Sequence, residues 1–587
     1  MTAATPTSRL PGPGYSSGRA SGTRKPGDTK HGRHARTADS GQSGASLAGR
    51  RRTADPGRFL LPALLGLYVV LSILLFDPKL GTFGDNAIYL ILGKSLAGGN
   101  GYRDLYLPGA PVHTQYPPGF PVILAGITLL CGGVNVLAAK LFVVLTGIGA
   151  MFFIYRLCEL TFPKRAWPIM ALFASVPALV ENNHWVLSEM PFLLATVAAL
   201  YCLVLADQRS RATAVRLRVG ACGLAVAASF IRTAGVAVVL GVLLFFLVRR
   251  RYRELVLLVL LFAAATLPWQ LHNTGAGHTQ PYLEQLLARQ PYSLEQGRAG
   301  ISDWALRVWQ NLRDYAATVI PRMLFPTRDD SWYEIISGII LSLLAAIGFL
   351  RSFRKPASQT PVGQLASKAP VGRVGALQSC AVFAAPLLLC WPNIWVSERL
   401  LLPFLPLVIV FLFYGLDWLG AKLGWRRFAP AFIGALVLAN TVHMASLAGK
   451  AVSDNLGYLR GDRCSGYEVD WRRYFEAIDW IKAQTPADAV VMARKPEFVY
   501  LLSGRQSYCY PITTDSAKIK LSLRRCQYVL ADNFQWTRTT PMLLMPVLHD
   551  NPGLWSLLFT TSPPKFYVLS VVQGTQVSRP TPAYGRE

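Results

Sequence analysis

Asp85 is the first residue of the sequence whose type and setting suggest chemistry. It follows an apolar segment, Leu60–Phe76, and precedes a run, Asn86–Ala97, whose apolar residues share one helical face. A carboxylate beside a membrane segment is costly, so it is a candidate functional group. An aspartate directly before such a run is also a preferred helix N-cap. Both interpretations of Asp85 remain open from the residues alone.

A second candidate acid, Glu189, opens another apolar segment. It stands between Ser188 and Pro191, and Glu181 lies nearby as a competitor. If Asp85 and Glu189 border one aqueous mouth, one can act as a general base and the other can support it. Glutamate is also favoured in the first turn of a helix, so a plain helix start is the alternative.

Two arginines, Arg232 and Arg399, lie at the ends of apolar segments. An arginine there can extend its charge to the membrane surface, or bind a phosphate with its planar fork of donors. For Arg399 the phosphate interpretation is favoured, although the neighbouring Glu398 offers a structural ion pair instead. Adjacent segments contain aromatic residues that can anchor the chain at the interface or stack on a sugar ring: Tyr282, Tyr292, Trp391 and Trp395.

A polar, proline-rich stretch, His113–Pro121, follows Asp85 in the same predicted loop. It reads His-Thr-Gln-Tyr-Pro-Pro-Gly-Phe-Pro. Binding residues are concentrated on loops that a rigid scaffold positions. We therefore expect three side chains of this stretch to contact a substrate: His113, Gln115 and Tyr116.

The elements that must position these residues are membrane spans. Hydrophobic residues make up 52% of the 587 residues, in long blocks separated by short basic stretches. A bilayer needs roughly 20 mostly apolar residues per helix, and about eleven blocks approach that length. They are Leu60–Phe76, Val136–Leu157, Ala166–Val180, Met190–Ala206, Val219–Ile231, Ala234–Val248, Leu255–Leu271, Ile335–Leu350, Leu377–Trp391, Leu400–Leu419 and Phe428–Leu447. The sequence predicts a polytopic α-helical protein of the lipid bilayer.

The net charge of +27 follows this topology and does not indicate a nucleic-acid partner. Basic residues gather in segment 1–58, which we expect to be a disordered cytoplasmic tail, and in short loops such as Arg249–Arg253. One assignment places every basic loop in the cytoplasm. It requires the short segment Phe120–Cys131 to dip into the outer face without crossing. The same assignment places four candidate residues on the outer face: Asp85, Glu189, Arg232 and Arg399.

From about residue 450 the pattern becomes that of a soluble domain on the outer face. Alternating helices and strands indicate an α/β domain over 450–575, after a membrane module over 59–449 and before a tail over 576–587. The predicted helices are Trp471–Gln484, Pro496–Ser503 and Pro541–His549. The predicted strands are Ala489–Ala493, Tyr508–Pro511, Gln527–Ala531, Leu557–Thr560 and Phe566–Val571. No phosphate loop or nucleophile elbow occurs, so a domain that shapes the outer mouth is favoured over an independent activity.

The cysteines indicate neither a metal site nor a disulfide framework. Cys464, Cys509 and Cys526 lie in the predicted outer domain, where one pair can form a disulfide. No cluster of cysteine and histidine has the spacing of zinc ligands.

Four stretches resemble motifs of the GT-C superfamily of glycosyltransferases: Asp85 after the first span, Tyr116–Pro121, Ser188–Pro191 and Arg399–Pro406. The similarity runs from about Leu60 to the end of the chain. Within the superfamily it is greatest to the branch of protein O-mannosyltransferases and lipid A aminoarabinose transferases.

This resemblance implies a bacterial enzyme of the cytoplasmic membrane that takes a sugar from a polyprenyl-phosphate donor. The acceptor would be an envelope lipid, glycan or protein, and the anomeric centre would be inverted. Asp85 would be the general base, and Arg399 with Arg232 would hold the phosphate. The family often has two adjacent acids here. This chain has Asn86 instead of the second, and Glu189 is expected to supply it.

The same residues also bear on whether a cofactor is needed and on which other classes of function are possible. Some superfamily members use a divalent metal, but a single acid at Asp85 leads us to expect no metal and no other cofactor. The alternatives are a transporter or lipid flippase, which would tend to show internal repeats and broken helices at the midplane, and a non-catalytic envelope assembly protein. The latter predicts that Asp85 is dispensable.

Overall fold

The structure, a computed structural model, describes residues 57–162, 166–276, 281–291, 296–327, 331–353 and 375–572. These residues belong to one compact unit, Asp55–Glu587. Tyr292, the predicted tail 576–587 and nearly all of the predicted tail 1–58 lie outside the described residues.

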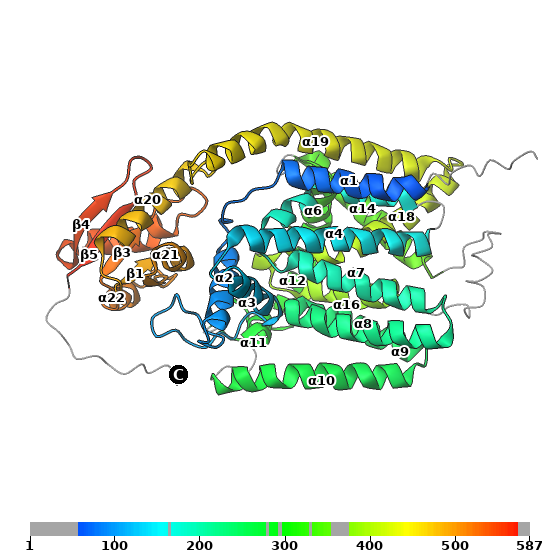
Figure 1. Ribbon diagram of the computed structural model, residues 1–587, viewed down its shortest axis with the longest axis horizontal. Helices are drawn as coiled ribbons and strands as arrows, with labels where there is room; N and C mark the ends of the chain where they lie inside the picture. The colour runs from blue at the N-terminus through cyan, green and yellow to red at the C-terminus, as the bar shows by residue number, and fades with distance from the viewer. Residues whose placement is uncertain are drawn as a thin grey trace, which may run out of the picture. The chain divides into compact units, whose positions relative to one another are not determined.

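Apolar helices form a bundle of roughly parallel rods (Figure 1). Within the described ranges, seven helical segments are long and apolar enough to cross a membrane. They are α4 (Val136–Thr161), α7 (Glu189–Ala206), α8 (Arg211–Ile231), α10 (Tyr252–Gly275), α14 (Trp332–Arg351), the segment Glu398–Lys422 and α19 (Phe428–Leu459). Segment Glu398–Lys422 contains α17 (Glu398–Leu401), η6 (Leu402–Phe404) and α18 (Leu405–Lys422). Four more bundle helices lie at the remaining predicted spans: α1 (Gly57–Leu74), α5 (Ala166–Ser175), α9 (Val236–Val248) and α16 (Ala376–Cys390). Helix α5 covers only the first part of the predicted span Ala166–Val180.

Short helices occupy the connections of the bundle. They are α6 (Pro177–Glu181), η1 (Asn182–His184), η2 (Thr233–Gly235), α11 (Pro281–Leu287), α12 (Ile301–Asp314), η4 (Tyr315–Val319), α13 (Ile320–Leu324) and η5 (Asn393–Trp395).

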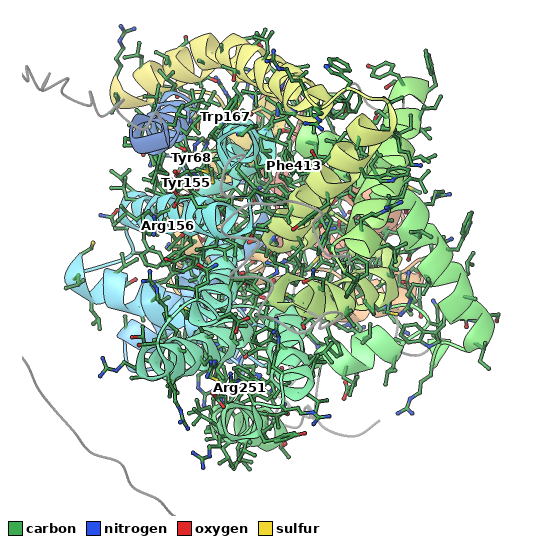
Figure 2. All side chains as sticks on the ribbon, turned by 90° about the vertical axis from the view of Figure 1, so that its right-hand side faces the viewer. Tyr68, Tyr155, Arg156, Trp167, Arg251 and Phe413 are labelled. Atoms are coloured by element: carbon green, nitrogen blue, oxygen red, sulfur yellow. The ribbon has the colours of Figure 1, made fainter. Side chains whose placement is uncertain are left out.

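The basic loops gather at one end of the bundle, which Figure 2 shows with Arg156 and Arg251 labelled. Ion pairs tie neighbouring helices together there. Arg218 of α8 lies 2.8 Å from Glu254 of α10, and Arg249 lies 3.5 Å from Asp207. This grouping agrees with the charge pattern used to predict the topology.

The helices α2 (Gly84–Ala97) and α3 (Gly119–Leu130) lie at the opposite end, which we call the site end. Near the start of α4, the buried Lys140 ammonium donates hydrogen bonds to the backbone carbonyls of Asp77 and Lys79, directly after α1. The chain therefore enters α3 and leaves it at the same end. As the charge pattern predicts, α3 does not cross the bundle.

A mixed α/β domain follows α19. Its five-stranded sheet has the order β2-β1-β3-β5-β4. The strands are β1 (Val490–Ala493), β2 (Gln506–Tyr508), β3 (Tyr528–Ala531), β4 (Trp555–Thr560) and β5 (Tyr567–Val571). The helices are α20 (Val469–Gln484), α21 (Pro496–Ser503), α22 (Ser516–Leu523), η7 (Thr540–Leu544), α23 (Met545–His549) and η8 (Pro552–Leu554). β1 is parallel to β2 and β3, whereas β5 is antiparallel to β3 and β4.

The α/β class and nearly all the predicted elements of this domain are confirmed. Helix α22 was not predicted, and β2 begins two residues earlier than the predicted strand Tyr508–Pro511. Helix α19 continues through the predicted boundary at 449/450 and ends at Leu459.

The domain packs on α2. Ala87 of α2 belongs to the same buried apolar cluster as Trp471 and Phe498 of the domain. The Tyr467 hydroxyl donates to the carbonyl of Leu80 at 2.6 Å. α2 is enclosed between α3 and α21, and most of its residues are buried.

Candidate active site

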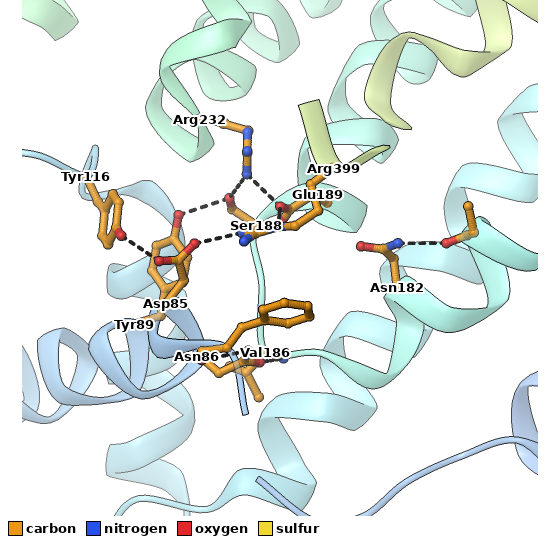
Figure 3. A network of polar contacts seen from close by, with 12 residues as sticks. Asp85, Asn86, Tyr89, Tyr116, Asn182, Val186, Ser188, Glu189, Arg232 and Arg399 are labelled. Carbon is orange, nitrogen blue, oxygen red and sulfur yellow. Dashed lines mark hydrogen bonds and ion pairs between the residues drawn. The ribbon is translucent and has the colours of Figure 1, made fainter. Parts of the chain in front are cut away.

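The structure brings the four predicted charged residues together at the site end, although they are far apart in sequence (Figure 3). Asp85 is the second residue of α2, and Glu189 is the first residue of α7. Arg232 links α8 to η2, and Arg399 lies in α17. Each therefore stands where a helix begins or ends, facing the same space.

Arg399 joins the two acids. Its Nη2 lies 2.9 Å from Oδ2 of Asp85, and its Nε lies 2.6 Å from Oε1 of Glu189. The same Glu189 oxygen lies 2.9 Å from Nη1 of Arg232. A guanidinium suits this position because its donors are fixed in a planar fork. The neighbouring Glu398, considered as a structural partner for Arg399, is not needed to explain where Arg399 lies.

Glu189 is the buried member of the group. It is 0% exposed, whereas the side chains of Asp85, Arg399 and Arg232 keep 33%, 24% and 21% of their surface exposed. A buried carboxylate between two guanidinium groups neutralises part of their charge and fixes their positions. Glu189 therefore has the position of a support for both arginines rather than of a second acid that meets a substrate.

Asp85 is held as an ionised carboxylate. The Tyr116 hydroxyl donates to Oδ1 at 2.8 Å, and Arg399 contacts Oδ2. Burial raises the pKa of Asp85, but the Arg399 charge and the Tyr116 hydrogen bond lower it by more, so this pKa lies below the ordinary aspartate range. Each carboxylate oxygen has a further lone pair and can still accept a proton.

The predicted loop residues take different places around Asp85. Gln115 and Tyr116 line the cavity beside it. His113 is buried behind them, where Nδ1 lies 2.9 Å from Asp104 and Nε2 accepts the Tyr116 amide N–H at 2.8 Å. Burial and the Asp85 charge raise the pKa of Tyr116, so its hydroxyl stays protonated and donates. His113 thus positions Tyr116, and it does not line the cavity.

Asn86, at the place of the missing second acid, points away from the cavity. It is fully buried, its Oδ1 accepts the Val186 amide N–H at 2.6 Å, and its Nδ2 donates to the Phe83 carbonyl at 3.2 Å. This side chain ties α2 to the loop before Glu189. The position therefore needs both a donor and an acceptor, which an ionised acid cannot provide.

A cavity of about 470 Å³ opens beside this group. Two cations and one carboxylate face it, and its remaining wall is largely aromatic and apolar. The charged and aromatic lining residues are Asp85, Arg232, Arg399, Phe83, Tyr89, Tyr116, Tyr282, Trp391 and Trp395. Such a wall can hold a sugar or an apolar chain, while the arginines can hold a phosphate.

Two residues of the group were not expected from the sequence. The Ser188 hydroxyl contacts the Tyr89 hydroxyl at 3.0 Å and accepts from Arg232 Nη1 at 3.2 Å. Ser188 was noted only as part of a helix start. Tyr89 is four residues beyond Asp85 on α2, a helical spacing that places both on one face.

A divalent metal does not fit this site. No group of three or more His, Cys, Asp or Glu side chains suited to a metal occurs in the described part of the chain. The two acids at the cavity's end are both paired with arginine, so a cation would meet two guanidinium groups.

Cys464, Cys509 and Cys526 are all free thiols.

Comparisons with known proteins agree with this architecture. Residues 92–272 match the family model for dolichyl-phosphate-mannose-protein mannosyltransferase. The crystal structure of ArnT from Cupriavidus metallidurans bound to undecaprenyl phosphate has a TM-score of 0.50 and 12% identity, covering 89% of this chain and 99% of that one. The apo oligosaccharyltransferase from Archaeoglobus fulgidus has a TM-score of 0.54 and 15% identity, covering 89% of this chain and 75% of that one. No curated protein matches the chain.

These similarities support one classification. The solved structures share the fold, and the family model covers the segment that begins within α2 and ends within α10. The predicted resemblance is confirmed by these matches, which support a membrane glycosyltransferase as the function of the chain.

Proposed function

We propose that the chain transfers a sugar from a polyprenyl-phosphate donor to an envelope acceptor, on the outer face of the cytoplasmic membrane, with Asp85 as general base. The observation that supports this most strongly is that Asp85, Arg399 and Arg232 line one cavity at the end of a membrane bundle. A carboxylate and two guanidinium groups are the groups that proton removal and a phosphate leaving group need.

The reaction would proceed as a single displacement. The acceptor hydroxyl oxygen forms a bond to the anomeric carbon while the bond from that carbon to the phosphate oxygen breaks. The acceptor proton passes to an Asp85 oxygen, and the electron pair of the broken bond stays on the polyprenyl phosphate. Attack opposite the leaving group inverts the anomeric centre.

The arginines would act on the leaving group. Glu189 fixes Arg399 by Nε and Arg232 by Nη1. The other N–H groups of both side chains remain available to a ligand in the cavity that these arginines line. Donors fixed before the reaction need no rearrangement as negative charge grows on the phosphate. The ArnT structure contains bound undecaprenyl phosphate, which is consistent with a lipid phosphate in this place.

The location of the site suits these substrates. The carrier's hydrocarbon tail needs the bilayer, whereas the sugar and the acceptor need water. The site end, with its cavity between membrane helices and a soluble domain, offers both environments. The basic loops at the other end favour the cytoplasm for that end.

Transfer by the purified full-length protein in liposomes tests the proposal. Undecaprenyl-phosphate sugars labelled in the sugar would be supplied with envelope extracts as acceptors. We expect labelled product with inverted configuration, and a cysteine placed at Gly101 should react with an impermeant reagent from the acceptor side. Absence of transfer with every sugar and extract would contradict the proposal.

A further inference from the structure

The α/β domain presents two basic residues and an aromatic residue beside Asp85. Arg494 and Lys495 directly follow β1, and Trp536 lies in the loop after β3. β1 and β3 are parallel neighbours, and β2 lies on the other side of β1. In open α/β sheets, ligands bind at the carboxyl ends of the strands where the strand order reverses, which here is between β1 and β3.

Both cations contact the Trp536 ring, and all three side chains keep part of their surface accessible. Lys495 Nζ lies 5.1 Å from the centroid of the Trp536 ring, and the Arg494 guanidinium carbon lies 5.8 Å from it. Trp536 is 49% exposed, and the Lys495 side chain keeps 20% of its surface exposed. An exposed tryptophan between two cations offers an apolar surface for a sugar ring and two donors for an anion.

The acids near this cluster do not neutralise it fully. Glu497 lies 3.9 Å from Lys495 Nζ, which is beyond hydrogen-bond distance, and its side chain is only 8% exposed. Asp532 is buried and accepts the Thr540 hydroxyl at 2.6 Å. Arg494 Nε donates to the Thr539 hydroxyl at 3.0 Å, and both cations keep part of their surface exposed beside Trp536, whereas these two acids are buried.

The cluster is adjacent to the general base. A Cβ atom placed on Gly84 would lie 3.5 Å from Lys495 Nζ and would overlap the Glu497 carboxylate. Gly84 directly precedes Asp85 in α2. An acceptor held by Lys495 and Trp536 can thus bring a hydroxyl to Asp85 from the side of the soluble domain.

We propose that Arg494, Lys495 and Trp536 form the acceptor subsite, and that the acceptor is an anionic glycan bearing a phosphate or carboxylate near the sugar that is modified. This inference rests on the proposed function, because it names the second substrate of the same reaction. The anionic glycan can be the head of a lipid or part of a water-soluble polymer.

Acceptor fractionation tests the chemistry of this subsite. Organic-soluble and water-soluble envelope extracts would each be divided by anion exchange and supplied to the full-length protein. We expect label only in retained, anionic fractions, and the phase that contains it identifies a lipid or a soluble source. Label confined to unretained fractions would overturn the inference and leave the proposed function intact.

Matched double variants separate this subsite from general surface charge. R494A/K495A should raise the acceptor KM by roughly tenfold or more, as expected for lost charge-assisted hydrogen bonds, without changing donor binding. R494K/K495R should recover most of the loss. R524A/R525A removes the same charge from exposed positions after α22 and should leave the acceptor KM unchanged. An unchanged acceptor KM in R494A/K495A would overturn the inference.

A binding measurement decides the matter even if no transfer is found. Acylation of Lys495 by an amine reagent would be followed by mass spectrometry with glucose 6-phosphate or glucose as the probe. Slower acylation with glucose 6-phosphate alone supports an anion subsite at Lys495. Equal rates with the two probes would contradict it, whether or not the enzyme transfers sugar.

Discussion

Nη2 of Arg399 lies 2.9 Å from Oδ2 of Asp85, so the group proposed to bind the leaving phosphate also contacts the proposed base. This contact couples the two halves of the reaction. When negative charge develops on the phosphate, the guanidinium that stabilises it also stays beside the carboxylate that takes up the proton. Several measurable consequences follow from this arrangement.

Replacing Arg399 should reduce the rate strongly, even by lysine. A lysine has one point charge and cannot contact Asp85 and Glu189 with a fixed fork. We expect kcat to fall about tenfold in R399K and about a hundredfold in R399Q, as for loss of an oriented donor to the leaving group. The measurement is kcat and donor KM in the liposome transfer assay, and R399K with wild-type kcat would contradict the assignment.

The acid limb of the pH profile should report the Asp85 environment. The ionised carboxylate is the base, and its pKa is below the ordinary value of about 3.9, so activity should stay level as pH falls toward that value. Y116F removes a hydrogen bond that lowers this pKa and should move the acid limb to higher pH. Y282F, which also alters the cavity wall, serves as the control and should keep the wild-type profile.

Glu189 should matter for stability as well as for rate. E189Q leaves two partly buried guanidinium groups without their shared counter-charge, and we expect a loss of about 3 kcal/mol in the free energy of unfolding in detergent. D479N breaks the exposed Asp479–Arg463 pair and should cost less than about 1 kcal/mol. Equal effects of the two variants would show that Glu189 does not hold the arginines.

Restoring the second acid should not improve the enzyme. N86D removes the donor to the Phe83 carbonyl and places a negatively charged oxygen beside that carbonyl oxygen. We expect a loss of about 1–3 kcal/mol in stability, measured by the same denaturation, and no gain in kcat. A more active N86D enzyme would show that this side chain can reach the cavity.

The sequence was informative where periodicity or charge decides structure. Long apolar blocks predicted the bundle helices. The positions of the basic loops correctly predicted that Phe120–Cys131 does not cross the bundle. The same topology placed Asp85, Glu189, Arg232 and Arg399 at one end, where the structure joins them. α22 was missed, although Asp515 at its start is a recognisable N-cap.

The roles within the site could not be predicted, since they depend on contacts between distant segments. Glu189 and Asp85 look alike in sequence, but Glu189 is buried between two arginines and Asp85 faces the cavity. His113 looked like a substrate ligand, and only the fold shows that it holds the Tyr116 backbone. The position of Lys495 beside Gly84 depends on how the α/β domain packs on α2.

The central claim is that Asp85 removes the acceptor proton, and D85N tests it most directly. Asparagine keeps the size of the side chain, and its single oxygen can still accept from either Tyr116 or Arg399, but it cannot take up the proton. We predict that D85N binds labelled undecaprenyl phosphate normally and that its kcat falls about a hundredfold or more, within the range of general-base catalysis. Transfer by D85N at a near wild-type rate would contradict the account.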